Sequence, residues 1–348
     1  MPVKGHFSGR GVVRWGIIGC GDVTEVKSGP GFALADGSRL VAVMRRDAAR
    51  AADYAKRHGV ARWYSEASAL IADPEVDAVY VATPPNSHAA YALAIAAAGK
   101  PAYVEKPMAR HGPECDRMVE AFERAKLPLF VAYYRRSLPC FLKVRELLRS
   151  GAIGRLTGVT YRLAEPHHLR GALWRTDAAV AGAGHFLDVG SHALDLLDFI
   201  LGPLEDVAGT AANLASDYSV EDSVALTFRA GGAAGSMSWN FASRVSDDTM
   251  RFTGTGGEIT FPMFTSRPVR LEDAAGVHHF DLPYPAHVGQ PMIQSMVDDL
   301  LGRGECPSTG VSARRTSLVM DGVLDAYYGG RADAFWDRPG TWPGRVPK

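Results

Sequence analysis

Residues 12–24, VVRWGIIGCGDVT, decide the fold expected for this chain. A run of apolar and β-branched residues leads directly into the pattern G-x-G, formed by Gly19 and Gly21. Glycines at the end of a first strand allow a tight turn and let the backbone approach a pyrophosphate, which then lies on the N-terminus of the next helix. The stretch therefore predicts a dinucleotide-binding turn, with Gly19, Gly21, Asp22 and Val23 at the cofactor.

The same motif departs from the usual dinucleotide fingerprint. Thr24 occupies the third position, where glycine or alanine is usual. Residues 28–31, SGPG, interrupt the helix that should follow. We therefore expect unusual packing between this helix and the first strand. A plain glycine-rich turn is the alternative interpretation, and the rest of the chain weighs against it.

Strand-like runs and alanine-rich helical segments alternate as far as about Val131. The expected strands are VVRWGIIG, LVAVMRR, AVYVATPP, PAYVEKP and LPLFVAYYRR, and the expected helices cover residues 47–58, 65–71, 87–98 and 113–125. Strands that alternate with helices predict βαβ units, right-handed crossovers and a doubly wound parallel sheet. Residues 12–134 are therefore expected to form an α/β Rossmann domain.

The pattern changes after about Arg135. Strand-like runs with turn glycines follow one another without long helices between most of them, which predicts a large, mainly antiparallel open sheet. Helices are expected at residues 141–149, 292–301 and 312–327, and the tail WDRPGTWPGRVPK is expected to be irregular. Residues 135–348 are therefore predicted to form an α+β domain for substrate binding and oligomerisation.

Composition narrows the classes of partner. The chain has 348 residues, enough for two domains, and equal numbers of basic and acidic residues, 38 each. Bulk charge thus favours a small-molecule substrate over a nucleic acid or an acidic membrane. The longest apolar run is far shorter than the roughly 20 residues that span a bilayer, and the first eleven residues lack the apolar core of a secretory leader. Four cysteines without a C-x-x-C pair fit reduced thiols and a cytoplasmic protein.

The second predicted strand ends in AVMRRD, which bears on the choice of cofactor. An acidic residue at this place usually binds the adenosine ribose of NAD, but here Arg45 and Arg46 stand there. Because a guanidinium binds a phosphate and cannot accept a hydrogen bond from a hydroxyl, the arginines favour NADP. In the alternative, both arginines are solvated surface charges, Asp47 binds the ribose, and NAD is the cofactor.

Two later strand ends carry further candidate cofactor residues. They are Thr83, Pro84, Asn86 and His88 in ATPPNSH, and Glu105 and Lys106 in VEKP. Open α/β sheets bind ligands at these carboxyl ends. Asn86 and His88 can instead cap the following helix. Pro107 keeps Lys106 out of helical geometry, which suits an ammonium group held at the sheet edge for proton transfer or charge stabilisation.

The second domain contains HFLDVGSHALDLLDFILG at residues 185–202. On a regular helix Asp188, His192, Asp195 and Phe199 share one face, and Leu194, Leu197 and Leu201 share another. The charged residues therefore form a stripe of their own beside a packing stripe. As alternatives, Asp188 can also cap the helix and Asp198 can be merely solvated.

Taken in order, GIIGCGDV, TPPNSH, EKP and GAGHFLDVGSHALDLLDFILG resemble the Gfo/Idh/MocA family of glucose–fructose oxidoreductases, inositol dehydrogenases and their relatives. The resemblance covers roughly residues 14–327. It implies a Rossmann domain, a second domain with a large sheet through which members associate, a nicotinamide cofactor, and a sugar, cyclitol or related substrate. The family's lysine falls on Lys106, and its aspartate and histidine fall on Asp188 and His192. A homodimer or homotetramer is expected.

We expect His192 to act as general acid/base, Lys106 to stabilise the developing alkoxide and Asp188 to orient the pair. Further substrate contacts are expected from Tyr133, Arg135, Trp174 and Arg175, together with Asp188 and His192. Arg175 can equally pair with Asp177.

Three alternative interpretations concern a metal site, a different enzyme class and a protein without catalysis. No metal site is expected, because His167, His168, His185, Asp188 and His192 match no short-spaced zinc signature. A related glycosidase with transient NAD chemistry is one rival function. A cofactor-binding sensor without catalysis is another, although Lys106, Asp188 and His192 are all present.

Overall fold

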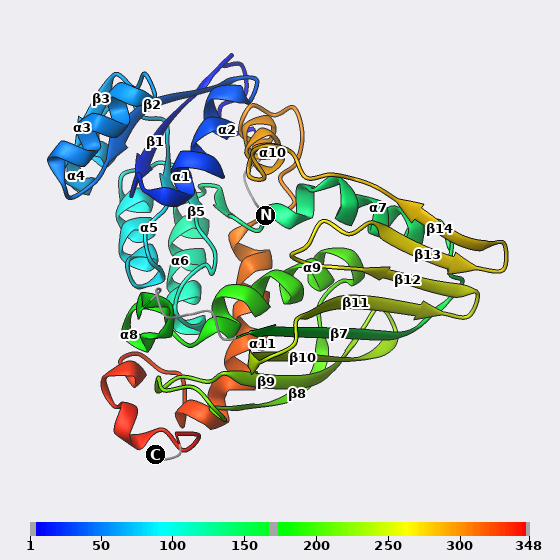
Figure 1. Cartoon of the computed structure of the whole chain (residues 1–348). Coiled ribbons are helices and arrows are strands. Elements are labelled where there is room, and N and C mark those ends of the chain that lie inside the picture. The colour runs from blue at the N-terminus through cyan, green and yellow to red at the C-terminus, as the bar shows by residue number, and fades with distance from the viewer. Residues whose placement is uncertain (1–4, 167–172, 346–348) are drawn as a thin grey trace. The chain divides into compact units, whose positions relative to one another are not determined.

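The computed structural model describes residues 5–166 and 173–345, which form two compact units (Figure 1). The first unit comprises the described residues up to Ala109, Pro113–Ser137 and Pro285–Arg314. The second comprises Arg110–Gly112, Leu138–Tyr284 and the described residues from Arg315 onward. No helix in the described ranges is long and apolar enough to cross a membrane.

The first unit is built on a six-stranded parallel sheet in the order β3-β2-β1-β4-β5-β6. The strands are β1 (Val13–Ile18), β2 (Ser38–Met44), β3 (Arg62–Tyr64), β4 (Ala78–Val81), β5 (Ala102–Val104) and β6 (Leu129–Val131). The strand order reverses direction between β1 and β4, and ligands of doubly wound folds bind beyond the carboxyl ends at such a point. The predicted parallel doubly wound sheet is confirmed, with β3 as an additional three-residue strand.

Helices join these strands as the alternating pattern predicts. They are α1 (Asp22–Val26), α2 (Gly29–Leu34), α3 (Ala48–Arg57), α4 (Ala67–Ala72), α5 (His88–Ala97) and α6 (Gly112–Ala125). The expected interruption at SGPG separates α1 from α2. Thr24 is buried at this break: its hydroxyl donates to the Gly21 carbonyl, and its own carbonyl accepts from Tyr54. A side chain at Gly29 would overlap the Thr24 carbonyl, so the short α1 and α2 depend on that glycine.

A late segment of the chain completes the core of the first unit. Helix α10 (Gln290–Leu300) lies beside α2 (Figure 1) and adds buried residues to the cluster around Trp15 and Phe32. A Cβ at Gly31 would lie 2.7 Å from the Ile293 side chain, which shows how close the two helices are. The sequence assigned residues 285–314 to the second domain, whereas the structure packs them in the first. The physical reason is that α2 has only six residues and leaves apolar sheet surface for α10 to cover.

The second unit holds an eight-stranded sheet in the order β14-β13-β12-β11-β7-β10-β9-β8. Its strands are β7 (Leu156–Pro166), β8 (Glu205–Ala212), β9 (Ser223–Ala230), β10 (Ala233–Ser243), β11 (Asp247–Gly254), β12 (Gly257–Phe261), β13 (Val269–Asp273) and β14 (Gly276–Phe280). All pairs are antiparallel except β7 with β10. The predicted large, mainly antiparallel sheet is confirmed.

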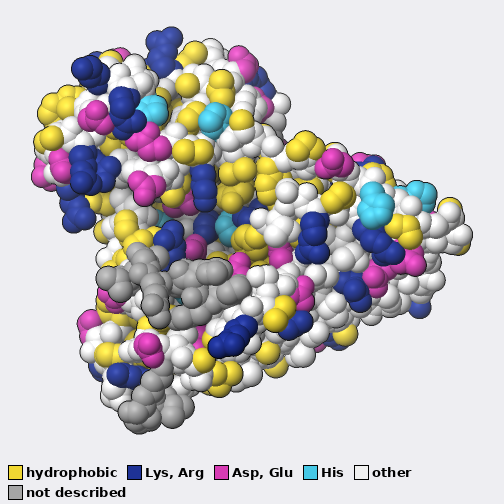
Figure 2. Space-filling view, viewed as in Figure 1, with side chains coloured by type: hydrophobic (Ala, Val, Ile, Leu, Met, Phe, Trp, Pro, Cys, Tyr) yellow, Lys and Arg dark blue, Asp and Glu magenta, His cyan; other side chains and the backbone are white. Residues whose placement is uncertain are grey.

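Along β9 buried and exposed residues alternate, so one face of the sheet carries the core and the other is open. The further helices are α7 (Pro139–Arg149), α8 (Ala178–Ala181), α9 (Ser191–Leu201) and α11 (Gly310–Tyr328). Phe186, just before α9, packs edge-on against Trp239 of β10. On the side of the molecule seen in Figure 2, acidic and basic side chains are interspersed without a large region of one sign.

Candidate active site

The G-x-G turn has the geometry of a ligand-binding turn. Gly19 has φ +93°, and a Cβ there would lie 2.7 Å from the Thr83 methyl group and 2.8 Å from the Ala82 carbonyl oxygen. Only glycine fits this conformation and this close approach. At Gly21 a Cβ would meet nothing nearer than the Gly19 carbonyl at 3.9 Å, so the backbone at the start of α1 is open to a ligand. The turn therefore fits a dinucleotide phosphate group.

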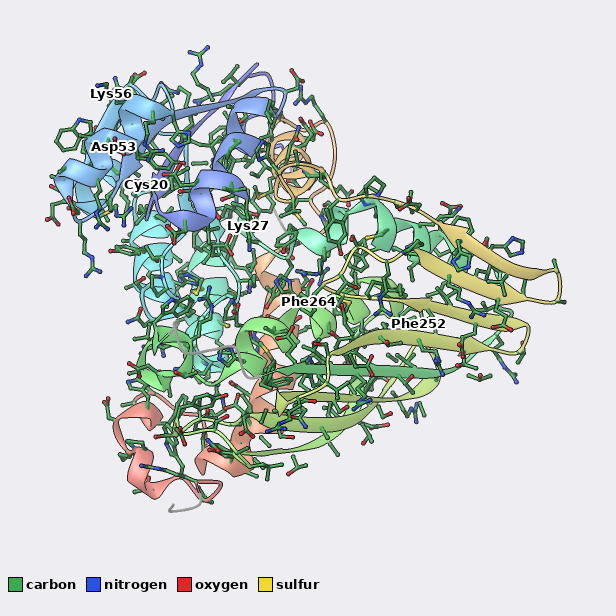
Figure 3. The ribbon with its side chains drawn as sticks, viewed as in Figure 1. Cys20, Lys27, Asp53, Lys56, Phe252 and Phe264 are labelled. Atoms are coloured by element: carbon green, nitrogen blue, oxygen red, sulfur yellow. The ribbon has the colours of Figure 1, made fainter. Side chains whose placement is uncertain are left out.

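Arg45 lies beside this turn. It follows the last residue of β2, and its guanidinium donates to the Cys20 carbonyl oxygen at 3.1 Å. Arg46 is exposed next to it. Asp47 caps α3 by accepting the Arg50 N–H at 3.1 Å. Cys20 and Lys27 flank α1 (Figure 3). The strand end thus presents a guanidinium to the turn, while the carboxylate of Asp47 serves the following helix.

The loop after β4 is fastened to the loop after β5 by His88. This side chain is completely buried, with one ring nitrogen 2.6 Å from the Thr83 carbonyl oxygen and the other 3.0 Å from that of Pro107. Burial lowers the pKa of His88, while hydrogen bonds to the backbone at Thr83 and Pro107 oppose that shift. The predicted direct contact of His88 with a cofactor has no exposed surface to support it. The geometry instead makes His88 a link between the two strand-end loops; Pro84 and Asn86 are exposed nearby.

Glu105 and Lys106 lie at the end of β5. One oxygen of Glu105 accepts the Tyr80 hydroxyl at 2.6 Å, and the other accepts the Lys106 backbone N–H at 3.1 Å. Desolvation raises the pKa of Glu105, while Tyr80 and Lys106 oppose that shift. Lys106 is half-buried, and its peptide bond to Pro107 is cis. Glu105 is therefore engaged in fixing the backbone that carries Lys106.

These contacts join four strand ends of the first unit. Gly19 touches the loop after β4 at Thr83, His88 connects that loop to Pro107, and Arg45 reaches back to the turn after β1. The structure therefore brings together the candidate cofactor residues predicted at β1, β2, β4 and β5. Tyr133 and Arg135, predicted to contact substrate, are 0% and 5% exposed, and Arg135 donates to the Tyr134 hydroxyl at 3.0 Å.

In the second unit, Asp188 and His192 lie on different kinds of helix. Residues Phe186–Gly190 form a single π-helical turn, and α9 begins at Ser191. A Cβ at Gly190 would overlap the Phe186 ring, so this wide turn requires that glycine. The sequence predicted one regular helix. The π turn changes the register between Asp188 and His192, and such turns are frequent at functional sites.

Asp188 binds Arg175, which the sequence predicted to contact the substrate or to pair with Asp177. The Arg175 guanidinium donates to Asp188 at 3.0 Å and lies 4.3 Å from the centre of the Trp174 ring. Asp177 caps α8 by accepting the Ala179 N–H at 2.9 Å. The alternative pairing of Arg175 with Asp177 is therefore wrong, and so is a capping role for Asp188. Trp174, Arg175 and Asp188 form one partly exposed cluster.

His192 is 4% exposed, and its ring meets Phe264 edge-on with centroids 6.0 Å apart. Phe264, labelled in Figure 3, belongs to a loop that sequence reasoning missed. Asp248 holds this loop by accepting the backbone N–H groups of Met263, Phe264 and Thr265 at 2.8, 2.7 and 3.1 Å. An aspartate placed 15 residues before the loop gives no local signal of this contact.

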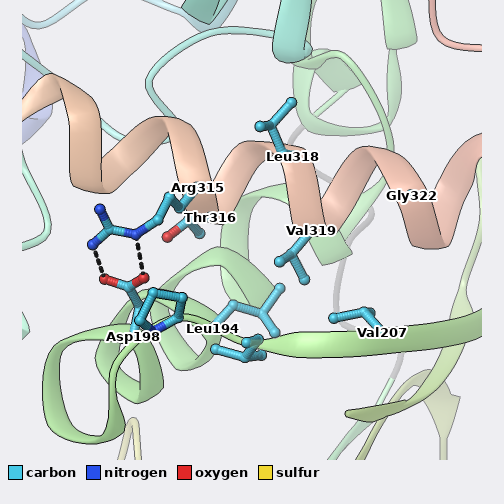
Figure 4. A pocket seen from close by; sticks show the side chains of 10 residues that line it. Leu194, Asp198, Val207, Arg315, Thr316, Leu318, Val319 and Gly322 are labelled. Carbon is cyan, nitrogen blue, oxygen red and sulfur yellow. Dashed lines mark hydrogen bonds and ion pairs between the residues drawn. The ribbon is translucent and has the colours of Figure 1, made fainter. Parts of the chain in front are cut away.

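The remaining acidic residues of α9 anchor the helix. Asp198 makes two 2.7 Å bonds to the Arg315 guanidinium, at the edge of a cavity of 370 Å³ lined mainly by aliphatic side chains (Figure 4). Asp195 is 1% exposed and lies 3.5 Å from the Thr316 hydroxyl. The alternative that Asp198 is merely solvated is therefore wrong. The charged stripe therefore contains two buried residues that anchor α9, Asp195 and Asp198, in addition to the candidate catalytic residues Asp188 and His192.

The described residues form neither a cluster suited to a metal ion nor a disulfide. Within residues 5–166 and 173–345, no group of three or more His, Cys, Asp or Glu side chains is arranged to hold a metal ion. His167 and His168 lie outside the described residues. The four cysteines form no disulfide.

Comparison with known proteins places both units in one family. Residues 13–133 match the GFO/IDH/MocA oxidoreductase family model with an NAD-binding Rossmann fold, and residues 141–260 match the GFO/IDH/MocA C-terminal domain. An oxidoreductase of Formosa agariphila is 36% identical over 316 residues, which cover 89% of this chain and 97% of that protein. A 1,5-anhydro-D-fructose reductase of Ensifer adhaerens is 30% identical, over 85% of this chain and 91% of that protein.

The fold of this chain is also similar to that of a solved structure. Levoglucosan dehydrogenase in complex with NADH and levoglucosan superposes with a TM-score of 0.81 at 22% identity, over 90% of this chain and 96% of that one. The strand-end turn, the sheet topologies, the two matched domain models and the relatives lead to one conclusion: this chain belongs to the GFO/IDH/MocA family of oxidoreductases with an NAD-binding Rossmann fold.

Proposed function

We propose that this chain transfers a hydride between a nicotinamide cofactor, preferably NADP, and a sugar, cyclitol or related carbonyl or alcohol compound. The observation that carries the proposal is the meeting of four strand-end loops around the G-x-G turn, with Arg45 on one side and the Lys106 loop on the other. The similar proteins named above reduce 1,5-anhydro-D-fructose or bind NADH with levoglucosan, which supports a sugar-like substrate.

The preference for NADP rests on Arg45 and Arg46. In NAD-specific folds an acidic side chain accepts hydrogen bonds from the ribose hydroxyls at this strand end. Here the nearest carboxylate in the sequence, Asp47, already accepts the Arg50 N–H in the first turn of α3. A guanidinium beside the turn suits a 2′-phosphate, to which it can donate two parallel hydrogen bonds. These residues therefore fit NADP better than NAD.

When bound, the nicotinamide would supply or accept the hydride, so the protein must move the proton. We assign that proton to His192, whose imidazole can donate it to a new alkoxide or accept it from an alcohol near neutral pH. Lys106 would stabilise the oxygen as negative charge develops. Asp188, held by Arg175, would orient the substrate and the acid/base pair, and Trp174 would offer its indole face to an apolar side of the sugar.

The remaining site residues have supporting roles in this proposal. Gly19, Gly21, Asp22 and Val23 would receive the pyrophosphate, and Thr83, Pro84, Asn86 and Glu105 would border the nicotinamide half. His88 would act by fixing two loops. Tyr133 and Arg135 would serve the substrate indirectly, because both are buried. The exposed face of the eight-stranded sheet would join protomers into a homodimer or homotetramer.

A substrate panel tests the proposal. The purified chain is mixed with NADPH or NADH and 1,5-anhydro-D-fructose, and with NADP⁺ or NAD⁺ and myo-inositol, D-glucose or levoglucosan, while nicotinamide absorbance is followed. We expect turnover with at least one compound and faster turnover with the phosphorylated cofactor. Hydrolysis of a chromogenic glycoside without net cofactor turnover would contradict the proposal in favour of a glycosidase. Cofactor binding without either reaction would favour a sensor.

A further inference from the structure

A short glycine loop directly precedes the turn that carries Asp188. Residues 182–184, Gly-Ala-Gly, are here named the GAG loop. Gly182 ends α8 with φ +90°, and a Cβ there would lie 2.5 Å from the Arg110 carbonyl oxygen. A Cβ at Gly184 would overlap the Glu221 carbonyl oxygen. The GAG loop is thus held against two other chain segments, and its close fit limits where the following π turn can begin.

Glu221 fixes one end of the GAG loop. Its side chain is fully buried, and both carboxylate oxygens accept the Gly184 N–H, at 3.0 and 3.1 Å. One of these oxygens also accepts the Tyr328 hydroxyl at 2.5 Å. A buried carboxylate is retained at a cost in desolvation unless its bonds compensate. Here the hydrogen bonds of the carboxylate include those to the Gly184 amide and to the hydroxyl of Tyr328 in α11.

Arg331 fixes the other end. Its side chain is 2% exposed, and its guanidinium makes three different hydrogen bonds: to the Gly182 carbonyl oxygen at 2.9 Å, to that of Arg110 at 2.8 Å and to the Asp321 carboxylate at 2.7 Å. Each of the three guanidinium nitrogens bonds a different acceptor, whereas a lysine would have to donate all of its hydrogen bonds from one nitrogen.

Arg331 belongs to a C-terminal segment that is packed in place. Phe335 and Trp342 are buried beside Tyr328, and Trp342 donates to the Phe335 carbonyl oxygen at 3.0 Å. The Arg110 guanidinium lies 3.6 Å from the centre of the Trp336 ring. Residues 336–345 of the tail that the sequence predicted to be irregular therefore form short turns that are anchored by aromatic side chains. They also lie outside both ranges matched by the family models.

We propose that Arg331 and Glu221 are positioning residues for the acid/base segment of the proposed oxidoreductase. They hold the two ends of the GAG loop and thereby set where the π turn with Asp188 and the helix with His192 begin. The inference rests on the proposed function for the roles of Asp188 and His192. A displacement of about 1 Å at a reacting group can lower turnover about 100-fold, so fixing this backbone has a large effect on rate.

The test compares Arg331→Met and Arg331→Lys with Arg338→Met, a matched control at an exposed arginine of the same C-terminal segment. Turnover is measured with the panel compound that wild type converts fastest, cofactor affinity by NADPH fluorescence titration, and loop order by hydrogen exchange of the Gly184 amide. We expect kcat to fall about 10- to 100-fold in Arg331→Met and less in Arg331→Lys. NADPH affinity should stay within about twofold, Gly184 exchange should accelerate, and Arg338→Met should match wild type.

Unchanged kcat and unchanged Gly184 exchange in a folded Arg331→Met variant would overturn the inference. If that variant does not fold, Arg331→Lys decides by the same two measurements. Glu221→Gln adds an independent variant, for which we expect faster Gly184 exchange and a smaller loss of kcat. A wild-type protein that turns over none of the panel contradicts the proposed function alone, because the exchange measurement still tests whether Arg331 and Glu221 hold the loop.

Discussion

A residue of the candidate site can be recognised in the sequence when the local backbone conformation determines its role. Gly19 and Gly21 follow directly from a strand that runs into a tight turn, and Arg45 follows from its place at the next strand end. The contacts of His88 and Arg175 could not be recognised in this way, because their partners are not set by the local sequence. His88 faces carbonyl oxygens of two loops, and Arg175 binds Asp188. A motif therefore predicts where a side chain lies better than what it binds.

At the scale of a single residue, we predict that the charge of Arg45 determines the preference for NADP. Replacement by glutamine, Arg45→Gln, removes the charge that would face a 2′-phosphate while keeping a side chain of similar length. We expect the NADP dissociation constant to rise about 10-fold or more, since hydrogen bonds between ionised groups each contribute about 1.5–3 kcal/mol. NAD binding should change little. Titration calorimetry with both cofactors measures this, and Arg39→Gln, at the exposed beginning of β2, is the control. An equal rise in the dissociation constants of NADP and NAD in Arg45→Gln would contradict the proposed preference for NADP.

Secondary-structure elements were predicted well where hydrophobic periodicity is local. Helices α3 to α7 agree with the expected segments to within a few residues. The edge strand β8 was missed, because EDVAGTAA is largely exposed and lacks the apolar alternation of a half-buried strand. The π turn at Phe186–Gly190 was missed for a different reason. It depends on Phe186 packing against Trp239, a contact between segments far apart in sequence.

At the scale of a structural element, we predict that Asp248 stabilises the loop at Met263–Thr265. Asp248→Ala leaves three backbone N–H groups without their acceptor, and the Asp248 side chain is largely buried. We expect the free energy of unfolding to fall by about 1–3 kcal/mol. Because Phe264 packs on His192, the KM for the sugar-like substrate should also rise. Urea denaturation and steady-state kinetics measure both effects.

Asp247→Ala is the matched control for this change. Asp247 is the neighbouring residue, and it pairs with Arg162, which is largely exposed. Ion pairs of that kind contribute about 0–1 kcal/mol, so this variant should lose less stability. Equal stability of the Asp248 and Asp247 variants would show that the carboxylate does not hold the loop.

At the scale of the whole chain, alternation of strands and helices was enough to predict two units with different sheets. It was not enough to assign every segment to its unit. Residues 285–314 lie late in the sequence, yet α10 packs beside α2 in the first unit, because α2, which begins at Gly-Pro-Gly, is short and leaves apolar surface to cover. The C-terminal turns do lie in the second unit, but the sequence did not predict how they pack, because their aromatic anchors contact Tyr328 of the preceding helix α11.

The central claim is that the chain transfers a hydride while His192 moves the proton. The most direct measurement uses the panel alcohol that wild type oxidises fastest, deuterated at the reacting carbon, with NADP⁺. Mass spectrometry then follows deuterium in the nicotinamide product. We predict stoichiometric transfer of deuterium by wild type, and a rate lowered about 10²- to 10⁴-fold in His192→Asn with NADP⁺ affinity retained. Deuterium absent from the nicotinamide, or an undiminished rate in His192→Asn, would contradict the account.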